Sequence, residues 1–85
     1  SLDAFRIQLA EAAAVVLRFS DASGAPVARL FRDDSVGADS DALLSAYGPA
    51  RTTDVLSPGA YQVRVTRSLT GDAHSFYALD IGLSR

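Results

Sequence analysis

The sequence predicts an all-β fold, an antiparallel β-sandwich of about seven or eight strands. Apolar and polar residues alternate with a period of two in its clearest segments, which is the pattern of a strand with one buried face. Short turns containing Gly and Pro separate these segments and leave no room for the crossover helices that parallel strands need. With 85 residues, the chain can form one small domain, 1–85, around a single core.

The first two strands are expected at residues 5–9 and 15–19, where every second side chain is apolar and polar residues such as Arg6 lie between them. Residues 9–18 would also suit a helix, because this run is rich in Ala and other strong helix formers. We favour strands, because period-two segments lie at both ends of the run and tertiary packing often overrides helix propensity.

Five further strands are expected after these two. The sixth strand of the chain shows the cleanest alternation, because aromatic and β-branched residues alternate with polar ones from Tyr61 onward. Turns at residues 21–26, 57–59 and 70–72 separate the strands, because Pro fixes φ and Gly supplies positive φ. Ser40 is expected to act as the N-cap of a short helical turn. The five strands are expected at residues 27–32, 43–47, 51–56, 61–67 and 77–83.

Tyr61 stands two residues after Gly59, at the start of the sixth strand. We expect its ring to enter the core and its hydroxyl to bond to the backbone, as in the tyrosine corner of immunoglobulin-like sandwiches. Stacking against a ligand is the alternative. Alternation with Val63 and Val65, both expected to be buried, favours the core.

Residues 56–65 read Leu-Ser-Pro-Gly-Ala-Tyr-Gln-Val-Arg-Val, and residues 76–81 supply a last strand, Phe-Tyr-Ala-Leu-Asp-Ile. Residues 3–9 open the chain with Asp-Ala-Phe-Arg-Ile-Gln-Leu, and residues 27–34 form the third strand and its acidic end. In this order the four stretches resemble the strands of the bacterial pre-peptidase C-terminal domain. The chain departs from that family at residues 12–14, which are Ala where the family usually has Gly and polar residues.

The resemblance implies a jelly-roll-like sandwich that is non-catalytic and accompanies a catalytic domain in a secreted or cell-surface bacterial protein. In that role residues 1–85 would assist the secretion, maturation or stability of a neighbouring domain, which would be their partner. Two alternatives stay open. The module could bind a carbohydrate or a matrix peptide as an adhesive domain, or it could be one repeat of a surface adhesin or array.

The residues offer little for catalysis. The chain has no Cys, and His74 is its one histidine. Asp72 and Ser75 are close to His74 in sequence, but neighbours in one loop do not form the geometry of a nucleophile, a base and an orienting acid. We therefore predict no enzymatic activity and interpret His74 as a solvated loop residue.

Net charge and hydropathy argue against binding to nucleic acid and against a membrane-spanning helix. The formal net charge is −2, whereas nucleic-acid binding needs a concentrated basic face. No apolar run approaches the roughly 20 residues that a membrane-spanning helix needs. The prediction therefore includes neither nucleic acid nor a membrane span.

Calcium is the one cofactor that the sequence suggests. Hard cations take about six to eight oxygen ligands from flexible loops, and one loop holds the carboxylates of Asp33, Asp34, Asp39 and Asp41. The spacing matches no EF-hand, so we favour a solvated acidic loop and keep calcium as the alternative.

A sugar or peptide ligand would need exposed aromatic and polar side chains. Tyr47 and Phe76 are the aromatic residues expected at the surface, and Arg64 and Arg67 are expected on the outward face of the sixth strand. The favoured interpretation of the two arginines is an ordinary solvated sheet face with cross-strand pairs to Asp.

Overall fold

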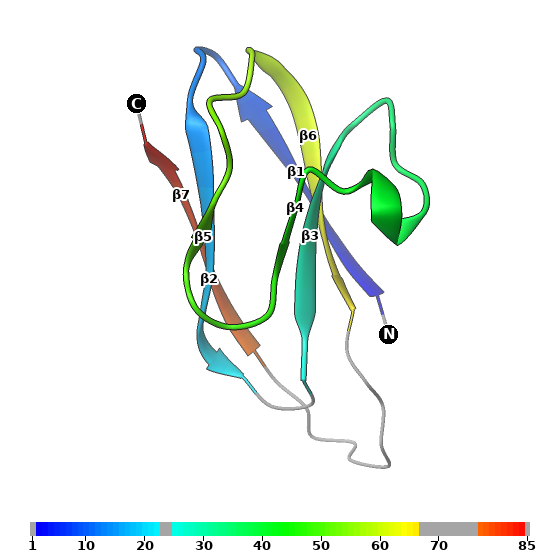
Figure 1. Ribbon diagram of the computed structural model, residues 1–85, viewed down its shortest axis with the longest axis vertical. Coiled ribbons are helices and arrows are strands. Elements are labelled where there is room, and N and C mark those ends of the chain that lie inside the picture. Colours follow the sequence, from blue (N-terminus) through cyan, green and yellow to red (C-terminus); the bar gives the residue numbers. More distant parts are fainter. Residues whose placement is uncertain (1, 23–24, 67–76, 85) are drawn as a thin grey trace.

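The computed structural model describes residues 2–22, 25–66 and 77–84 and confirms the all-β sandwich. Its strands form two antiparallel sheets that stack face to face (Figure 1). One sheet has the order β1-β6-β3-β4 and the other has the order β5-β2-β7. The strands are β1 (Leu2–Leu9), β2 (Ala14–Ala22), β3 (Val27–Arg32), β4 (Leu44–Ala46), β5 (Arg51–Thr52), β6 (Gly59–Thr66) and β7 (Tyr77–Ser84).

The chain passes from one sheet to the other at nearly every connection, because only β3 and β4 are neighbours both in sequence and in a sheet. β6 lies between β1 and β3 and pairs with both. β2 lies between β5 and β7 in the second sheet. These pairings join strands far apart in sequence, which agrees with a jelly-roll-like arrangement.

The core lies between the inner faces of the two sheets. Alternate residues of the central strands β6 and β2 supply five of the seven largest fully buried side chains, as the period-two pattern predicts, and Leu9 of β1 and Leu30 of β3 supply the other two. The strands at the edges contribute fewer buried residues. The core consists of Leu9, Val15, Leu17, Ala28, Leu30, Ala46, Leu56, Tyr61, Val63 and Val65.

The strand prediction for residues 9–18 is confirmed. β1 ends at Leu9, and β2 begins at Ala14. The N–H of Ala13 donates to the carbonyl oxygen of Leu56 at 3.1 Å, and the N–H of Leu56 donates back to Ala13 at 2.8 Å. Antiparallel pairing with residues distant in sequence therefore satisfies the backbone of Ala13, which a helix would have satisfied locally.

The fifth strand is shorter than the predicted 51–56 and consists of Arg51–Thr52. At Thr53 the N–H donates to the carbonyl oxygen of Val15 at 2.9 Å, while the Thr53 hydroxyl oxygen accepts from the Val15 N–H at 2.9 Å. The side-chain hydroxyl thus takes the place of the backbone carbonyl that a continuing strand would offer, so the ladder is interrupted there and resumes only at the Ala13–Leu56 bridge.

A short helical turn is present, but the N-cap prediction for Ser40 is wrong. A 3-10 helix, η1, spans Asp39–Asp41, and Ala38 is its N-cap. The carbonyl oxygen of Ala38 accepts from the N–H of Asp41 at 2.9 Å, so the turn begins two residues before Ser40, which lies inside it. In the described part of the chain, no helix is long and apolar enough to cross a bilayer.

Replacing Val63 by Ala tests the core. Val63 is fully buried on β6, so Val63→Ala should lower the free energy of unfolding by about 2 kcal/mol through lost apolar burial and the remaining cavity. Val55→Ala is the matched control, because Val55 is exposed and the same change there should cost under about 0.5 kcal/mol. Urea unfolding measures both values, and equal losses would contradict the assigned core.

Candidate functional site

The segment between β3 and β4, residues 33–43, covers part of the outer face of the four-stranded sheet, and we call it the acidic loop. Phe31 occupies an outward position on β3, opposite Gln62, yet only 2% of it is exposed. Gly37 and Asp39 of the acidic loop line the same hollow as Phe31. Figure 1 shows the loop and its helix η1 standing beside β3 and β6.

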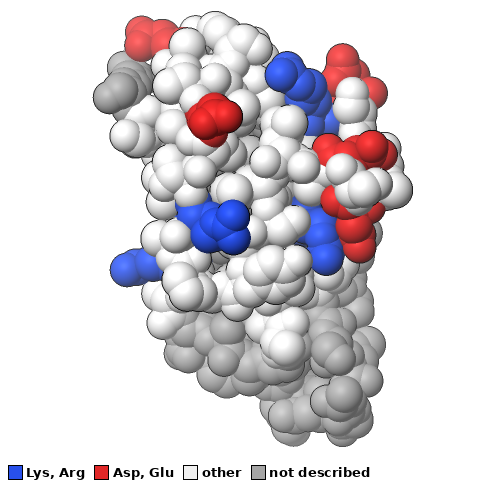
Figure 2. Space-filling view, in the orientation of Figure 1, with Lys and Arg blue, Asp and Glu red and all other residues white. Residues whose placement is uncertain are grey.

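Ion pairs join the acidic loop to arginines of the sheet. The carboxylate of Asp33 lies 2.7 Å from the guanidinium of Arg6, and that of Asp39 lies 3.6 Å from Arg29. Figure 2 shows acidic side chains gathered at this side of the molecule with basic ones next to them. The acidic loop thus lies over Phe31, with the carboxylates of Asp33 and Asp39 beside arginines of the sheet.

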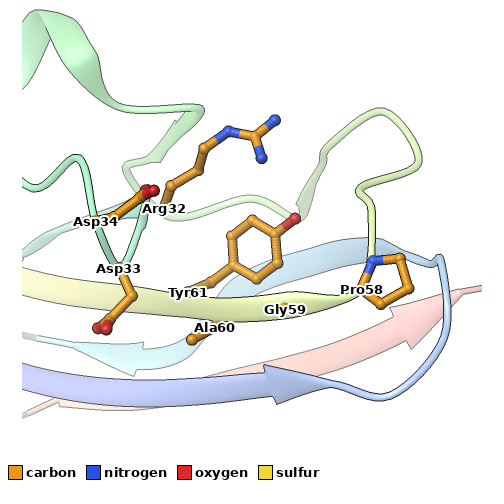
Figure 3. Close-up of a pocket in the computed structure, with 7 residues that line it drawn as sticks. All are labelled: Arg32, Asp33, Asp34, Pro58, Gly59, Ala60 and Tyr61. Atoms are coloured by element: carbon orange, nitrogen blue, oxygen red, sulfur yellow. The ribbon is translucent and has the colours of Figure 1, made fainter.

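The first hollow beside the acidic loop has a volume of about 290 Å³ and lies between the end of β3 and the start of β6 (Figure 3). Arg32 extends over the ring of Tyr61, while the carboxylate of Asp33 points away from that ring. The hollow is lined by Arg32, Asp33, Asp34, Pro58, Gly59, Ala60 and Tyr61.

Tyr61 is the structural anchor of this hollow, as predicted. Its ring is buried, and its hydroxyl donates to the carbonyl oxygen of Ser57 at 2.6 Å. Gly59 has a φ of 144°, which side-chain-bearing residues rarely adopt, so the turn before β6 favours glycine. A buried ring with an occupied hydroxyl stabilises the turn and presents no face for ligand stacking.

Two further hollows flank the acidic loop. The second, of about 450 Å³, shares Arg32 with the first and is lined by Arg32, Ser35, Val36, Gly37, Asp41 and Leu43. The third, of about 140 Å³, lies over the outer face of β3 and β6 and is lined by Arg29, Phe31, Gly37, Asp39, Arg64 and Thr66.

The four carboxylates proposed for calcium are divided among these hollows. Asp33 and Asp34 line the first, Asp41 the second and Asp39 the third. Among the described residues, no three His, Cys, Asp or Glu side chains are grouped so that they could hold a metal ion. Calcium binding stays a prediction from the sequence, without a coordination set to argue from.

The residues expected to bind a sugar or peptide are not brought together. Arg64 lines the third hollow, whereas Tyr47 is exposed and lines none of the three. Phe76 and Arg67 lie outside the described residues, as does His74.

Within the described residues, the expected pairing of Arg64 with an Asp across the strands is not found. Its cross-strand neighbours are Ala4 on β1 and Arg29 on β3, and its Nε donates to the side-chain oxygen of Gln62 at 2.8 Å. Sequence reasoning missed Arg29. The alternation of β3 places Arg29 outward, but only the pairing of β3 with β6 sets it opposite Arg64.

The chain was compared with family models, with curated proteins and with solved structures, and none of them matches.

Removing the hydroxyl of Tyr61 tests its anchoring role. Tyr61→Phe leaves the Ser57 carbonyl oxygen without its donor and should lower the free energy of unfolding by about 1 kcal/mol. Tyr47→Phe makes the same chemical change at an exposed ring and should leave that free energy within about 0.5 kcal/mol of the parent. Denaturant titration of the two variants compares them, and a Tyr61→Phe variant as stable as the parent would refute the anchor.

Proposed function

We propose that this sandwich is a non-catalytic accessory module of a secreted or cell-surface bacterial protein, and that it packs against a neighbouring domain and supports that domain's secretion, maturation or stability. The observation that carries this proposal is the apolar side of the sandwich between its edge strands β1 and β7. The sequence resemblance to the pre-peptidase C-terminal domain supports the same role.

β1 and β7 lie at the same side of the sandwich. At the opposite side β4 lies against β5, which places β7 of the smaller sheet toward β1 of the larger one. The hydroxyl of Tyr77 on β7 donates to the carboxylate of Asp3 on β1 at 2.7 Å, which joins the two strands. We call this the open side and define it by Phe5, Ile7, Ile81 and Leu83.

The side chains of the open side point inward but remain accessible. Phe5 stands opposite the buried Val63, yet 43% of it is exposed. Ile81 and Leu83 stand opposite buried residues of β2, and their exposed fractions are 40% and 51%. Core-facing apolar positions are normally covered, so their exposure on both edge strands of the open side points to an interaction site.

Burying the exposed apolar side chains of the open side against another domain would stabilise the contact. Fully burying a Phe, Ile or Leu side chain contributes about 1.5–3 kcal/mol, so covering the exposed part of each adds about 1 kcal/mol. A neighbouring domain that belongs to the same chain loses little translational and rotational entropy when it docks. The burial of Phe5, Ile81 and Leu83 is therefore enough to hold such a domain against the open side.

Polar substitution of the open side tests the proposal in the parent protein. Leu83→Ser should lower the melting temperature of the neighbouring domain, because it removes an apolar contact between the two domains, while the isolated sandwich changes little. Val55→Ser is the matched control, since Val55 is exposed in the segment between β5 and β6. Calorimetry of both variants measures this melting temperature, and an unchanged value in Leu83→Ser would contradict the proposal.

A further inference from the structure

Two arginines stand directly opposite each other on the outer face of the four-stranded sheet. Arg29 on β3 is the register partner of Arg64 on β6. Like charges in directly opposed positions on adjacent strands are destabilising. The pair therefore needs negative charge from elsewhere to offset its repulsion.

The protein supplies only part of that charge. Asp39 lies 3.6 Å from Arg29, and 76% of its side chain is exposed, so the pair is long and well screened. Arg64 donates from Nε to the neutral oxygen of Gln62. Among the described residues no carboxylate lies within ion-pair distance of Arg64, whose two terminal nitrogens carry no protein partner there.

The third hollow lies between these two arginines. Its volume of about 140 Å³ equals that of about five waters in the liquid. Phe31 and Gly37 supply apolar walls, while Thr66 accepts from Arg29 at 3.4 Å and keeps its hydroxyl proton available for a ligand. Donors from two strands thus meet in a space suited to one small oxyanion and the atoms attached to it.

The charges around the third hollow determine how many negative charges a bound ligand can carry. β3 and β6 contribute the positive charges of Arg29 and Arg64, and the acidic loop contributes the negative charge of Asp39. On β1 the residue opposite Arg64 is the neutral Ala4, and the nearby Arg6 is paired with Asp33. These three charges sum to +1, so one carboxylate neutralises the site, whereas a polyanion would bring more negative charge than the two arginines can offset. Neutral hydroxyl groups beside that carboxylate could donate to Asp39.

We propose that the third hollow binds a sugar carrying a single carboxylate, a uronic acid. The planar guanidinium of Arg64 takes the carboxylate with its two terminal nitrogens, and Arg29 and Thr66 complete the contact from the other side. Asp39 accepts hydrogen bonds from the hydroxyls of the ring. This site is separate from the open side, which lies at the inner faces of β1 and β7.

The test is to titrate the protein with sugars and to follow the NMR chemical shifts of its backbone amides and of its arginine Nε–H groups. Methyl α-galacturonide should give saturable shifts at Arg29, Arg64 and Thr66, and the neutral methyl α-galactoside should give none. Arg64→Gln should weaken binding about tenfold or more, because it removes a charge-assisted hydrogen-bonding pair. Arg64→Lys keeps the charge but loses the planar fork, so it should weaken binding as well.

Arg51→Gln is the matched control, because Arg51 is exposed on β5 of the other sheet and the net charge changes equally. It should bind like the parent protein. Equal losses in Arg51→Gln and Arg64→Gln, equal shifts with the neutral sugar, or shifts that never saturate would each overturn the proposal. A sulfated sugar that binds more tightly than the uronide would overturn the choice of a single carboxylate.

Discussion

The inner face of β6 is the constraint on which the rest of the structure depends. Tyr61, Val63 and Val65 are buried there, and β6 is the strand that pairs with both β1 and β3. Its register therefore determines which residues of its neighbours face the core and which face outward. A slip of one residue would turn all of them over, so one strand fixes both the core and the outer face with Arg29 and Arg64.

The sequence predicted the strands well because the signal for a half-buried strand is local. The alternation after Tyr61 and the Pro-Gly turn before it are read within ten residues, and both are present in the structure. Pairing is different, since β6 meets β1 and β3 across many intervening residues and periodicity does not identify partners. For this reason Arg29 was missed, and Arg64 was assigned an Asp partner that is not found among the described residues.

The acidic loop shows how one segment serves both packing and charge. As a sequence it is a run of carboxylates, which suggested either calcium or a solvated surface. In the structure it covers Phe31 and joins the sheet through Asp33 and Asp39. Its carboxylates are distributed among three hollows, so the loop acts on the outer face of the sheet as a wall with negative charge. The spacing of these carboxylates along the chain does not reveal which hollow each of them lines in the folded protein.

The outer face of β3 and β6 thus has a small polar hollow, whereas the open side between β1 and β7 exposes apolar side chains. We propose that a neighbouring domain of the parent protein covers the open side. Hydrogen–deuterium exchange tests it most directly, by comparing the isolated sandwich with the whole parent protein. If a neighbouring domain covers the open side, the amides of β1 and β7 exchange more slowly in the parent protein, and equal exchange in the two samples would show that the open side is not covered.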